Sequence, residues 1–517
     1  MDERDRQHLR DLVVHAQAAT DYAWAHGRGW WRSRIVDART SLGGHLRYAP
    51  DEIVEVPHSP VTPPIAPCAE DAAEPADGAV ESAGHAAESA GHAAVPGAAV
   101  PGTAVPTDGA AAPGARPRPR LVARRVPFDA IPREAWDRLL AVTACATPFS
   151  RWEFHRAWWD GYGEAAHEDY MVCLEAGGEP GEGAARERGT EAPGVQAAGP
   201  QLDPAAIVAI APLMHRHEVE PDDAILHTAI RHAPRTALTP VPDRAKAIFF
   251  AASYHADYAT LLCNPTDLPD VAAAVVEALA AGPGLLHGSD DWDVVDLRRL
   301  RADDPAFHAL EAAFCAASDR YGWEVARELE EVCPVLRVDT DDWETYLETL
   351  STRNRHEIRR KLRRAEATGP VEFDEVADPA TAVDELIAIH QARWGEDGLF
   401  PETEGGARSR RFFRRLAELE GPDGTLRIGR LRVGGNVVFM CVGFHDRDTV
   451  YYYNAGSDPD ARALSPGIIG VAAYLRHGLG EGRRVFDFLR GNEGYKYTWG
   501  AVDRPIHRLI VTRRADR

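Results

Sequence analysis

Three ionisable residues near the C-terminal end of the chain have the types and spacing needed for proton transfer. Asp487 lies in the strand-like run VFDFLRG between Phe486 and Phe488, and an acid between aromatic residues can lose hydration, which raises its pKa. Alternation along a strand points Asp487 to the face opposite its two neighbours. Glu493 opens a predicted short helix, and Lys496 follows on the same helix face. These residues are candidates for acid–base chemistry, and a structural Asp487–Lys496 or Glu493–Lys496 ion pair is the alternative.

A second segment could bind an anion. A predicted helix opens at Ser465-Pro466-Gly467, and a helix N-terminus presents unpaired N–H groups and the positive end of a dipole. Gly467 and Gly470 would let a phosphate approach closely, and Ser465 can cap the helix or donate to the anion. The alternative is an ordinary capped helix after a turn.

A basic helix is the third candidate. Seven Lys and Arg side chains lie within 353–364 of an otherwise acidic protein. Arg360, Arg363 and Arg364 fall at i, i+3 and i+4, so they share a face that could bind the phosphates of CoA, a nucleotide-sugar, a lipid or a tRNA end. The alternative is a solvated face that pairs with the surplus acids.

The elements that position these residues have a regular order over 336–517. Pro466 in the first turn and glycines at the end delimit the helix from Ser465. Gly-Gly and Asp-Arg-Asp turns join three alternating runs into an antiparallel meander. In chain order we expect a helix at about 341–367, the strand VEFDEV, helices at 379–394 and 407–420, the meander from GTLRIGRLRVGG to DTVYYYNAG, the helix from Ser465, the strand with Asp487, a short helix and a final strand HRLIVTRR.

The preceding part of the chain predicts a second α/β half over 121–335. Its expected elements include a buried helix in 148–163, a strand AAIVAIAPLMHR, and helices at 266–281 and in PAFHALEAAFCAASDRYG. A Gly/Pro-rich insertion at 177–203 and an Ala/Pro/Gly-rich linker at 51–120 cannot bury enough apolar surface to order, so both are expected to be disordered. Residues 1–50 are expected to form a helical segment.

Bulk composition narrows the function classes. The net charge of -22, from 58 basic and 80 acidic side chains, argues against general nucleic-acid binding. Seven scattered cysteines without a CxxC pair argue against a disulfide framework or zinc cluster, so no metal is expected. The charged N-terminus without an apolar h-region, and apolar runs too short to span a bilayer, favour a cytoplasmic protein.

Four stretches carry a resemblance to a known family. The most specific is the acidic strand followed by G-x-x-x-Y-K-x-x-W-G. The chain is similar to the CelD-like (BioF-like) acetyltransferases, a double-GNAT group related to the Fem aminoacyltransferases. The stretches are PFSRWEFHRAWWDGYG (148–163), RNRHEIRRKLRRAEATGPVEF (353–373), ALSPGIIGVAAYLRHGL (463–479) and FDFLRGNEGYKYTWG (486–500).

The resemblance implies a fold and a co-substrate. The expected fold is α/β (α+β), with tandem GNAT-like halves, each a mixed, mostly antiparallel sheet flanked by helices. The expected co-substrate is acetyl-CoA or another acyl-CoA. The usual GNAT phosphate loop reads Arg/Gln-x-x-Gly-x-Gly/Ala, whereas this chain offers Arg462, Gly467 and Gly470 at other spacings, and Pro466 removes one donor.

The resemblance also implies roles for residues. Tyr453 and Asn454, at the end of the fourth strand, would hold pantetheine, although three adjacent tyrosines could instead pave a sheet surface. Asp487 would be the base or a substrate anchor, and Glu493 a second candidate base. The remaining expected site residues are Lys496 for charge stabilisation, Ser465, Gly467 and Gly470 for the pyrophosphate, and Arg360, Arg364, Arg490 and Tyr495 for substrate binding.

Three functions are compatible with these features. The first is an acyl-CoA-dependent N-acyltransferase that acylates, most simply acetylates, an amine of a small molecule or a sugar or polysaccharide precursor. The second is a Fem-like transferase that uses aminoacyl-tRNA. The third is a non-catalytic scaffold that binds a metabolite or a partner.

Overall fold

The computed structural model describes most of the chain from residue 119 onward. The expected N-terminal helical segment (1–50), nearly all of the linker (51–120) and most of the insertion (177–203) lie outside the described residues. From Arg120 onward the described residues cluster in one compact unit. The described ranges are 119–176, 202–216, 238–241, 245–281, 292–446 and 449–514.

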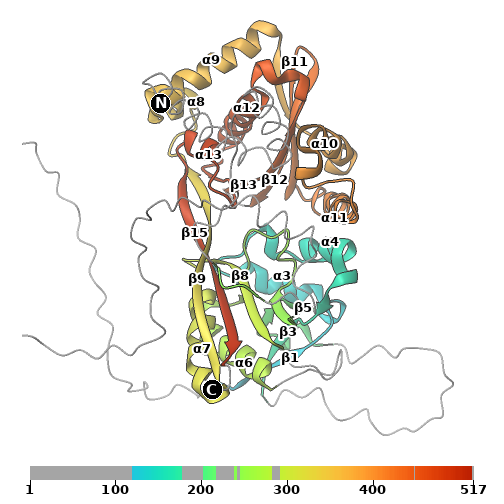
Figure 1. The fold of residues 1–517 in the computed structure, drawn as a ribbon, viewed down its shortest axis with the longest axis vertical. Helices are drawn as coiled ribbons and strands as arrows, with labels where there is room; N and C mark the ends of the chain where they lie inside the picture. Colours follow the sequence, from blue (N-terminus) through green and yellow to red (C-terminus); the bar gives the residue numbers. More distant parts are fainter. Residues whose placement is uncertain are drawn as a thin grey trace, which may run out of the picture. The chain divides into compact units, whose positions relative to one another are not determined.

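One 11-stranded sheet runs through the described part of the chain (Figure 1). Its pairs are antiparallel except for β13 with β14 and β6 with β8, so the predicted mixed, mostly antiparallel α/β class is confirmed. In sheet order the strands are β10 (Val371–Glu375), β11 (Leu426–Val433), β12 (Asn436–Asp446), β13 (Thr449–Ser457), β14 (Val485–Asp487), β9 (Trp323–Arg337), β15 (Val502–Arg513), β8 (Val294–Arg301), β6 (Ala247–Phe250), β5 (Leu213–Arg216) and β2 (His167–Glu168).

Strands β9 and β15 belong to both halves of this sheet. They pair antiparallel along the whole of β15, and Figure 1 shows them running from the upper to the lower group of elements. Near one end Val335 of β9 pairs with Asp487 of β14, and toward the other Ile510 of β15 pairs with Asp296 of β8. The expected boundary between residues 335 and 336 therefore lies inside β9, and the two halves share one sheet.

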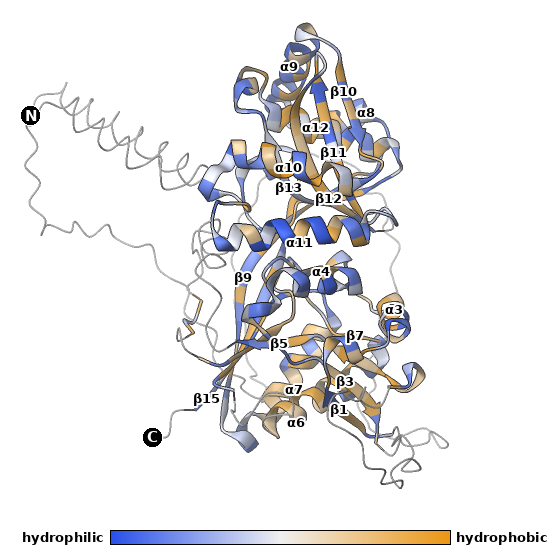
Figure 2. Cartoon of the chain, turned by 90° about the vertical axis from the view of Figure 1, so that its right-hand side faces the viewer, coloured by the Kyte–Doolittle hydropathy of each residue, from blue (hydrophilic) through white to orange (hydrophobic). Residues whose placement is uncertain are grey.

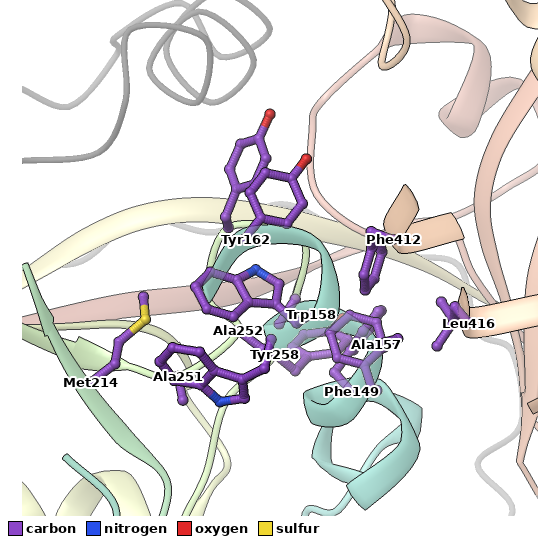
Figure 3. Close-up of a cluster of buried hydrophobic side chains, with 14 of the residues drawn as sticks. Phe149, Ala157, Trp158, Tyr162, Met214, Ala251, Ala252, Tyr258, Phe412 and Leu416 are labelled. Carbon is purple, nitrogen blue, oxygen red and sulfur yellow. The ribbon is translucent and has the colours of Figure 1, made fainter. Parts of the chain in front are cut away.

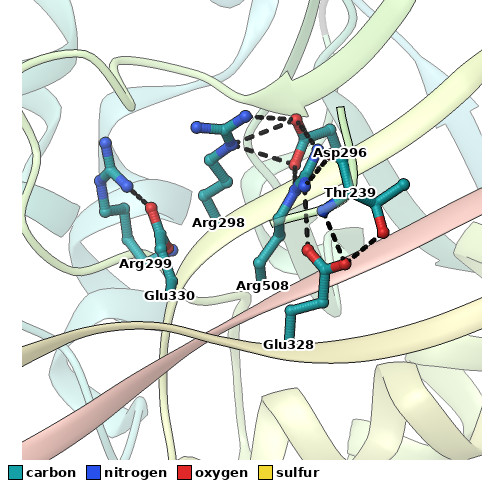
Figure 4. A network of polar contacts seen from close by, with 7 residues as sticks. All are labelled: Thr239, Asp296, Arg298, Arg299, Glu328, Glu330 and Arg508. Atoms are coloured by element: carbon teal, nitrogen blue, oxygen red, sulfur yellow. Dashed lines mark hydrogen bonds and ion pairs between the residues drawn. The ribbon is translucent and has the colours of Figure 1, made fainter. Parts of the chain in front are cut away.

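A buried ion-pair network fixes these strands to β8 (Figure 4). Arg508 of β15 is fully buried and donates to both carboxylate oxygens of Asp296, at 2.6 and 2.9 Å. The same guanidinium reaches Glu328 of β9 at 2.9 Å, and Arg299 pairs with Glu330 beside it. A buried charge that loses its partner is costly, so the network specifies the register of three strands.

A four-stranded antiparallel sheet forms a separate layer in the first half. Its order is β1 (Leu121–Arg125), β3 (Met171–Glu175), β4 (Ala209–Ala211) and β7 (Leu262–Cys263). The prediction of one strand over AAIVAIAPLMHR is wrong, because Pro212 separates β4 from β5. Proline cannot donate to a strand ladder, and here the chain passes from one sheet to the other.

Helices cover both faces of the large sheet. The predicted single helix at 341–367 is two helices, because Leu350 is extended and Ser351 caps a new helix by accepting the Asn354 N–H. No described helix combines the length and the apolar character needed to cross a bilayer. The helices are α3 (Arg133–Val142), α4 (Trp152–Tyr162), α6 (Leu268–Ala280), α7 (Pro305–Tyr321), α8 (Trp343–Thr349), α9 (Thr352–Thr368), α10 (Pro379–Trp394), α11 (Glu404–Glu420), α12 (Pro466–Gly480) and α13 (Gly494–Thr498).

The two halves meet through a continuous apolar core (Figure 3). Figure 2 shows α4 of the first half beside α11 of the second. Phe149 and Trp158 lie with Phe412 and Leu416 in this core. Gly161 permits the close approach, since an added Cβ would lie 3.0 Å from the Phe412 Cβ. The predicted buried helix in 148–163 is thus confirmed as part of the interface between the halves.

Candidate active site

The frame of the candidate site is the point where β13 and β14 separate. The two parallel strands pair only from Thr449 to Tyr451 and from Val485 to Asp487. Beyond that point β13 carries a bulge, because Val442 of β12 pairs with Asn454 and Gly443 pairs with Tyr452, so Tyr453 is an extra residue. A bulge bends its strand and leaves main-chain groups out of the ladder. The ladder between β13 and β14 therefore ends here, and beyond it β13 continues without β14 as a partner.

The side chain of Asn454 is fixed at this divergence. Its Oδ1 accepts the Ala455 N–H at 2.8 Å and faces Nε2 of the buried His390 of α10 at 3.1 Å. Trp394 of α10 donates its indole N–H to the Ala455 carbonyl at 3.0 Å. Because Oδ1 is occupied by two donors, the carboxamide orientation is set, and Nδ2 is the atom that could donate to a ligand amide.

The hydroxyl of Tyr453 points toward the first half of the chain instead. It donates to the His255 carbonyl at 2.9 Å and lies 3.1 Å from the His255 Nδ1. The same imidazole contacts the Tyr162 hydroxyl at 2.9 Å, which in turn contacts Ser409 at 2.7 Å. The Phe412 ring stacks on His255 with centroids 4.4 Å apart. Tyr453 thus belongs to a hydrogen-bonded chain between the halves.

The N-terminus of α12 is the candidate anion site. Ser465 adopts a left-handed backbone (φ 57°, ψ 58°), and its side chain makes no capping bond. Gly467 is exposed, and a Cβ added to it would meet nothing within 4 Å. Gly470 is different, because a Cβ there would overlap the ring of Phe439 of β12. Gly470 therefore serves the packing of the helix on the sheet and not the expected contact with phosphate. Ser465 and Gly467 lie at the open end of the helix.

Asp487 lies on the sheet face opposite Phe486 and Phe488, as alternation predicts. Phe486 and Phe488 pack in the cluster with α12, whereas the Asp487 carboxylate accepts from the Tyr258 hydroxyl at 2.8 Å and from Arg504 at 3.2 Å. It also accepts the Leu489 N–H at 2.9 Å and is fully buried. Burial raises the pKa of Asp487, against the lowering effects of Arg504, Tyr258 and the Leu489 N–H. The Asp487 carboxylate is fully buried and its oxygens accept from protein donors. This geometry therefore does not support the expectation that Asp487 takes a proton from an amine.

Lys496 holds the turn that follows β14. The predicted shared face with Glu493 is observed, with Nζ 2.9 Å from the Glu493 Oε2. The buried ammonium also donates to the carbonyls of Leu489, Arg490 and Gly491 at 3.0, 2.6 and 3.0 Å. The turn contains Leu489 at φ 57° and Gly491 at φ 106°, so its main chain is held in the left-handed region by side-chain contacts.

The other three residues expected to bind substrate lie in different surroundings from one another. Arg490 pairs with the buried Asp257 of the first half. Tyr495 is 36% exposed at the surface of α13. Arg360 pairs with Glu357 on the exposed side of α9.

Arg364 of the basic helix contacts the segment that precedes the candidate anion site. It donates to the Ala463 carbonyl at 2.6 Å, two residues before Ser465. The basic face is thus partly neutralised, as the solvated-face alternative expects, and one of its members adjoins the start of α12.

Sequence reasoning missed the segment 251–260 between β6 and β7. It is buried apart from the half-buried Ala259, and its His255, Asp257 and Tyr258 make the contacts to Tyr453, Arg490 and Asp487 described above. Its aromatic and alanine-rich composition is typical of core. Three polar side chains within four residues of such a run were the available signal, but their partners lie about 200 residues away.

Comparison with known proteins identifies the second half. Residues 352–497 match the family model described as Acetyltransferase (GNAT) domain. The comparison with curated proteins found no match. Similar solved structures include FemX, at 10% identity, covering 74% of this chain and 96% of that chain, with a TM-score of 0.42. A tandem GNAT protein from the clavulanic acid biosynthesis pathway is 10% identical over 77% of this chain and 99% of that one, with a TM-score of 0.37.

The meander, the divergence of β13 from β14 and the helix α12 all lie within the matched region. Residues 352–497 therefore form a GNAT domain. The chain thus carries a domain of the GNAT acetyltransferase type in its second half.

Proposed function

We propose that the second half transfers an acyl group from an acyl-CoA, acetyl-CoA in the simplest case, to an amine of a small molecule or a sugar precursor. The observation that carries the proposal is the divergence of β13 from β14 at the Tyr453 bulge, inside a region that matches a GNAT domain. On the β14 side the N–H groups of residues 488–491 are all bonded within the protein, so the β13 edge would supply the main-chain donor to the thioester.

The proposed division of labour follows from the contacts. Main-chain N–H groups beyond the bulge would polarise the thioester carbonyl, and Asn454 would bind the amides of the carrier. The N-terminus of α12 at Ser465 would bind the pyrophosphate. The amine nitrogen attacks the carbonyl carbon, the C–N bond forms and the C–S bond breaks. The departing CoA thiolate takes up the proton that the amine nitrogen loses and leaves as the thiol. In this proposal Asp487 and Lys496 are positioning residues that hold the turn after β14.

Gly467 offers a sharp test of the pyrophosphate site. An Asp side chain at this position finds open space and suits the first turn of a helix, because a negative charge there interacts favourably with the dipole. The same charge would repel a pyrophosphate. We expect Gly467→Asp to fold normally and to weaken acetyl-CoA binding by at least tenfold in calorimetry, with a matching loss in a thiol-release assay.

Gly467→Ala is the matched control, because its methyl group meets open space and carries no charge, and it should bind acetyl-CoA more tightly than the Asp variant. Equal affinity of the Asp variant and the wild type would remove the phosphate role of α12. Absence of acyl-CoA binding by the wild-type chain would remove acyl-CoA as the donor and leave the tRNA-dependent and scaffold hypotheses.

A charged tRNA is the second candidate donor. The supporting observation is the contact between Arg364 and the Ala463 carbonyl, which brings the basic helix α9 next to the proposed anion site. Filter binding at low salt distinguishes the donors, because tRNA binding that disappears in an Arg363→Glu/Arg364→Glu variant, without acetyl-CoA binding by the wild type, would favour the tRNA-dependent reaction.

A further inference from the structure

Four potential metal ligands converge at one end of the second half, away from the diverging strands. Glu375 ends β10, His445 lies near the end of β12, and His477 and Glu481 lie in and just after the last turn of α12. The Glu375 Oε1 is 3.6 Å from the His445 Nε2 and 3.7 Å from the His477 Nε2. The His477 Nε2 is also 3.7 Å from the Glu481 Oε1.

These atoms approach one another without hydrogen bonding. Within the described part of the chain, the Glu375 Oε1, both ring nitrogens of His445 and the His477 Nε2 are buried and have no hydrogen-bond partner. The His445 side chain is only 3% exposed, and its Nε2 faces the shared Glu375 oxygen. The Glu375 Oε1, the His445 Nε2 and the His477 Nε2 converge on one point, so a single ion between them would satisfy all three at once.

We propose that Glu375, His477 and Glu481, with His445 as the fourth ligand, bind a divalent first-row metal ion. Zn²⁺ is the expected ion, because it prefers this set of ligands. One oxygen or nitrogen from each of the first three lies within 4.8 Å of the others. In a tetrahedral site with bonds of about 2.0 to 2.1 Å, neighbouring ligand atoms are about 3.3 to 3.4 Å apart. The three shortest separations, 3.6 to 3.7 Å, need a small contraction to reach that geometry, whereas His445 lies outside the 4.8 Å group and its ring must move further toward Glu481 and His477.

The surrounding groups suit such an ion. Arg427 pairs with the Glu375 Oε2, which leaves Oε1 directed at the two imidazoles. The Phe373 ring lies against the His477 ring, with centroids 5.3 Å apart, and orients it. Imidazole with carboxylate is a ligand combination that Zn²⁺ accepts readily. Two carboxylates and the dication would sum to neutrality, with Arg427, which also lies 4.0 Å from the Glu481 Oε2, and Arg483 as the nearby positive charges.

The ion would fasten the C-terminal end of α12 to the ends of β10 and β12. The opposite end of the same helix is the proposed pyrophosphate site, so a metal here would fix the helix axis. This inference does not depend on the proposed function, because its readout is metal binding.

The test uses the full chain, stripped of metal with a chelator and dialysed. Titration with ZnCl₂ in competition with a chromophoric chelator should give one equivalent bound per chain, and Zn²⁺ should raise the melting temperature by mass action. Substitution with Co²⁺ should give the visible absorption of a four-coordinate site. His477→Gln should lower the Zn²⁺ affinity at least tenfold.

Glu481→Gln is the second variant, chosen because Glu481 is exposed and its replacement leaves the helix intact. It should weaken Zn²⁺ binding and change the Co²⁺ spectrum. His356→Gln, an exposed histidine on α9, is the matched control and should bind like the wild type. Absence of zinc binding by the wild type, or zinc binding of unchanged affinity in both His477→Gln and Glu481→Gln, would overturn the proposal.

Discussion

At the scale of single residues, two buried charges act on the same short turn from different sides. Asp487 accepts the Leu489 N–H, and Lys496 donates to the carbonyls of Leu489, Arg490 and Gly491. Neither side chain pairs directly with the other in the described contacts; each instead satisfies main-chain groups of a turn with two positive φ values. The residue types of Asp487 and Lys496 suggested acid–base chemistry. Their contacts favour a different role, in which both side chains hold the main chain of this turn in place.

Lys496→Met tests this positioning role. The substitution keeps the length of the side chain but leaves three carbonyls without their donor and removes the ion pair with Glu493, so we expect a loss of about 2 to 4 kcal/mol in the free energy of unfolding. Urea denaturation followed by circular dichroism measures the loss. Lys361→Met, which removes only a helix-surface pair with Glu357, should cost less than about 0.5 kcal/mol. Equal stability of the Lys496 variant and the wild type would contradict the role.

A second residue-scale prediction concerns pH. Glu420 of α11 is fully buried, and burial raises its pKa well above the usual value, against the lowering effect of Arg151. An acid with a raised folded-state pKa contributes most to stability below its unfolded pKa of about 4.5, and the contribution is lost as pH rises toward the folded pKa. Glu420→Gln should therefore gain about 1 to 3 kcal/mol over the wild type at pH 7 and little at pH 4.

Unfolding free energies between pH 4 and pH 8 measure this difference. Glu418→Gln, two residues earlier and exposed, is the control and should follow the wild-type curve. A wild-type and Glu420→Gln pair with parallel pH profiles would show that Glu420 is ionised in the folded state.

At the scale of elements, two of the glycines in α12 have opposite constraints. Gly470→Ala would drive a methyl group into the Phe439 ring and should destabilise the protein by about 1 to 3 kcal/mol. Gly467→Ala meets open space and should be neutral or stabilising by up to about 1 kcal/mol, because alanine favours a helix. Thermal denaturation of the two variants gives a direct comparison, and a Gly470→Ala variant as stable as Gly467→Ala would disprove the packing argument.

Elements with a strong local signal could be predicted from the sequence. The meander, α10, α11, α12 and α13 follow from periodicity, Gly-Gly turns and proline in a first helical turn. Where prediction failed, a local break was decisive: Pro212 splits an apolar run between two sheets, and Leu350 with the Ser351 cap interrupts a long helical pattern.

The candidate site was predictable only in part. The end of β13, the start of α12 and the motif around Asp487 were found, because each is contiguous in sequence. The contacts that decide their roles are not contiguous, since Tyr258 meets Asp487 across 229 positions. The group of Glu375, His445 and His477 has no recognisable spacing for the same reason, because three different elements supply it.

At the scale of the whole molecule, the shared sheet makes the halves depend on each other. The order of helices and strands along the chain suggests two consecutive domains. In the structure, however, the last strand, β15, pairs between β9 and β8 of the first half. The pairing of β15 with β8 and β9 is long-range, and local patterns carry no information about it. The ion pairs of Arg508 with Asp296 and Glu328 then reinforce this arrangement.

This sharing predicts that the expected C-terminal half, residues 336–517, will not fold alone. Without β9 and β8, the strand β15 exposes Ile506, Leu509, Ile510 and Val511, all of which are buried in the structure. Re-exposing four such side chains costs on the order of 6 to 12 kcal/mol, comparable to the whole stability of a typical domain. We expect residues 336–517 to show no cooperative thermal transition by circular dichroism, whereas residues 119–517, which retain every described strand, should unfold in a single transition. A sharp transition for the shorter fragment would mean that β14 and β15 find other partners, and that the halves are independent after all.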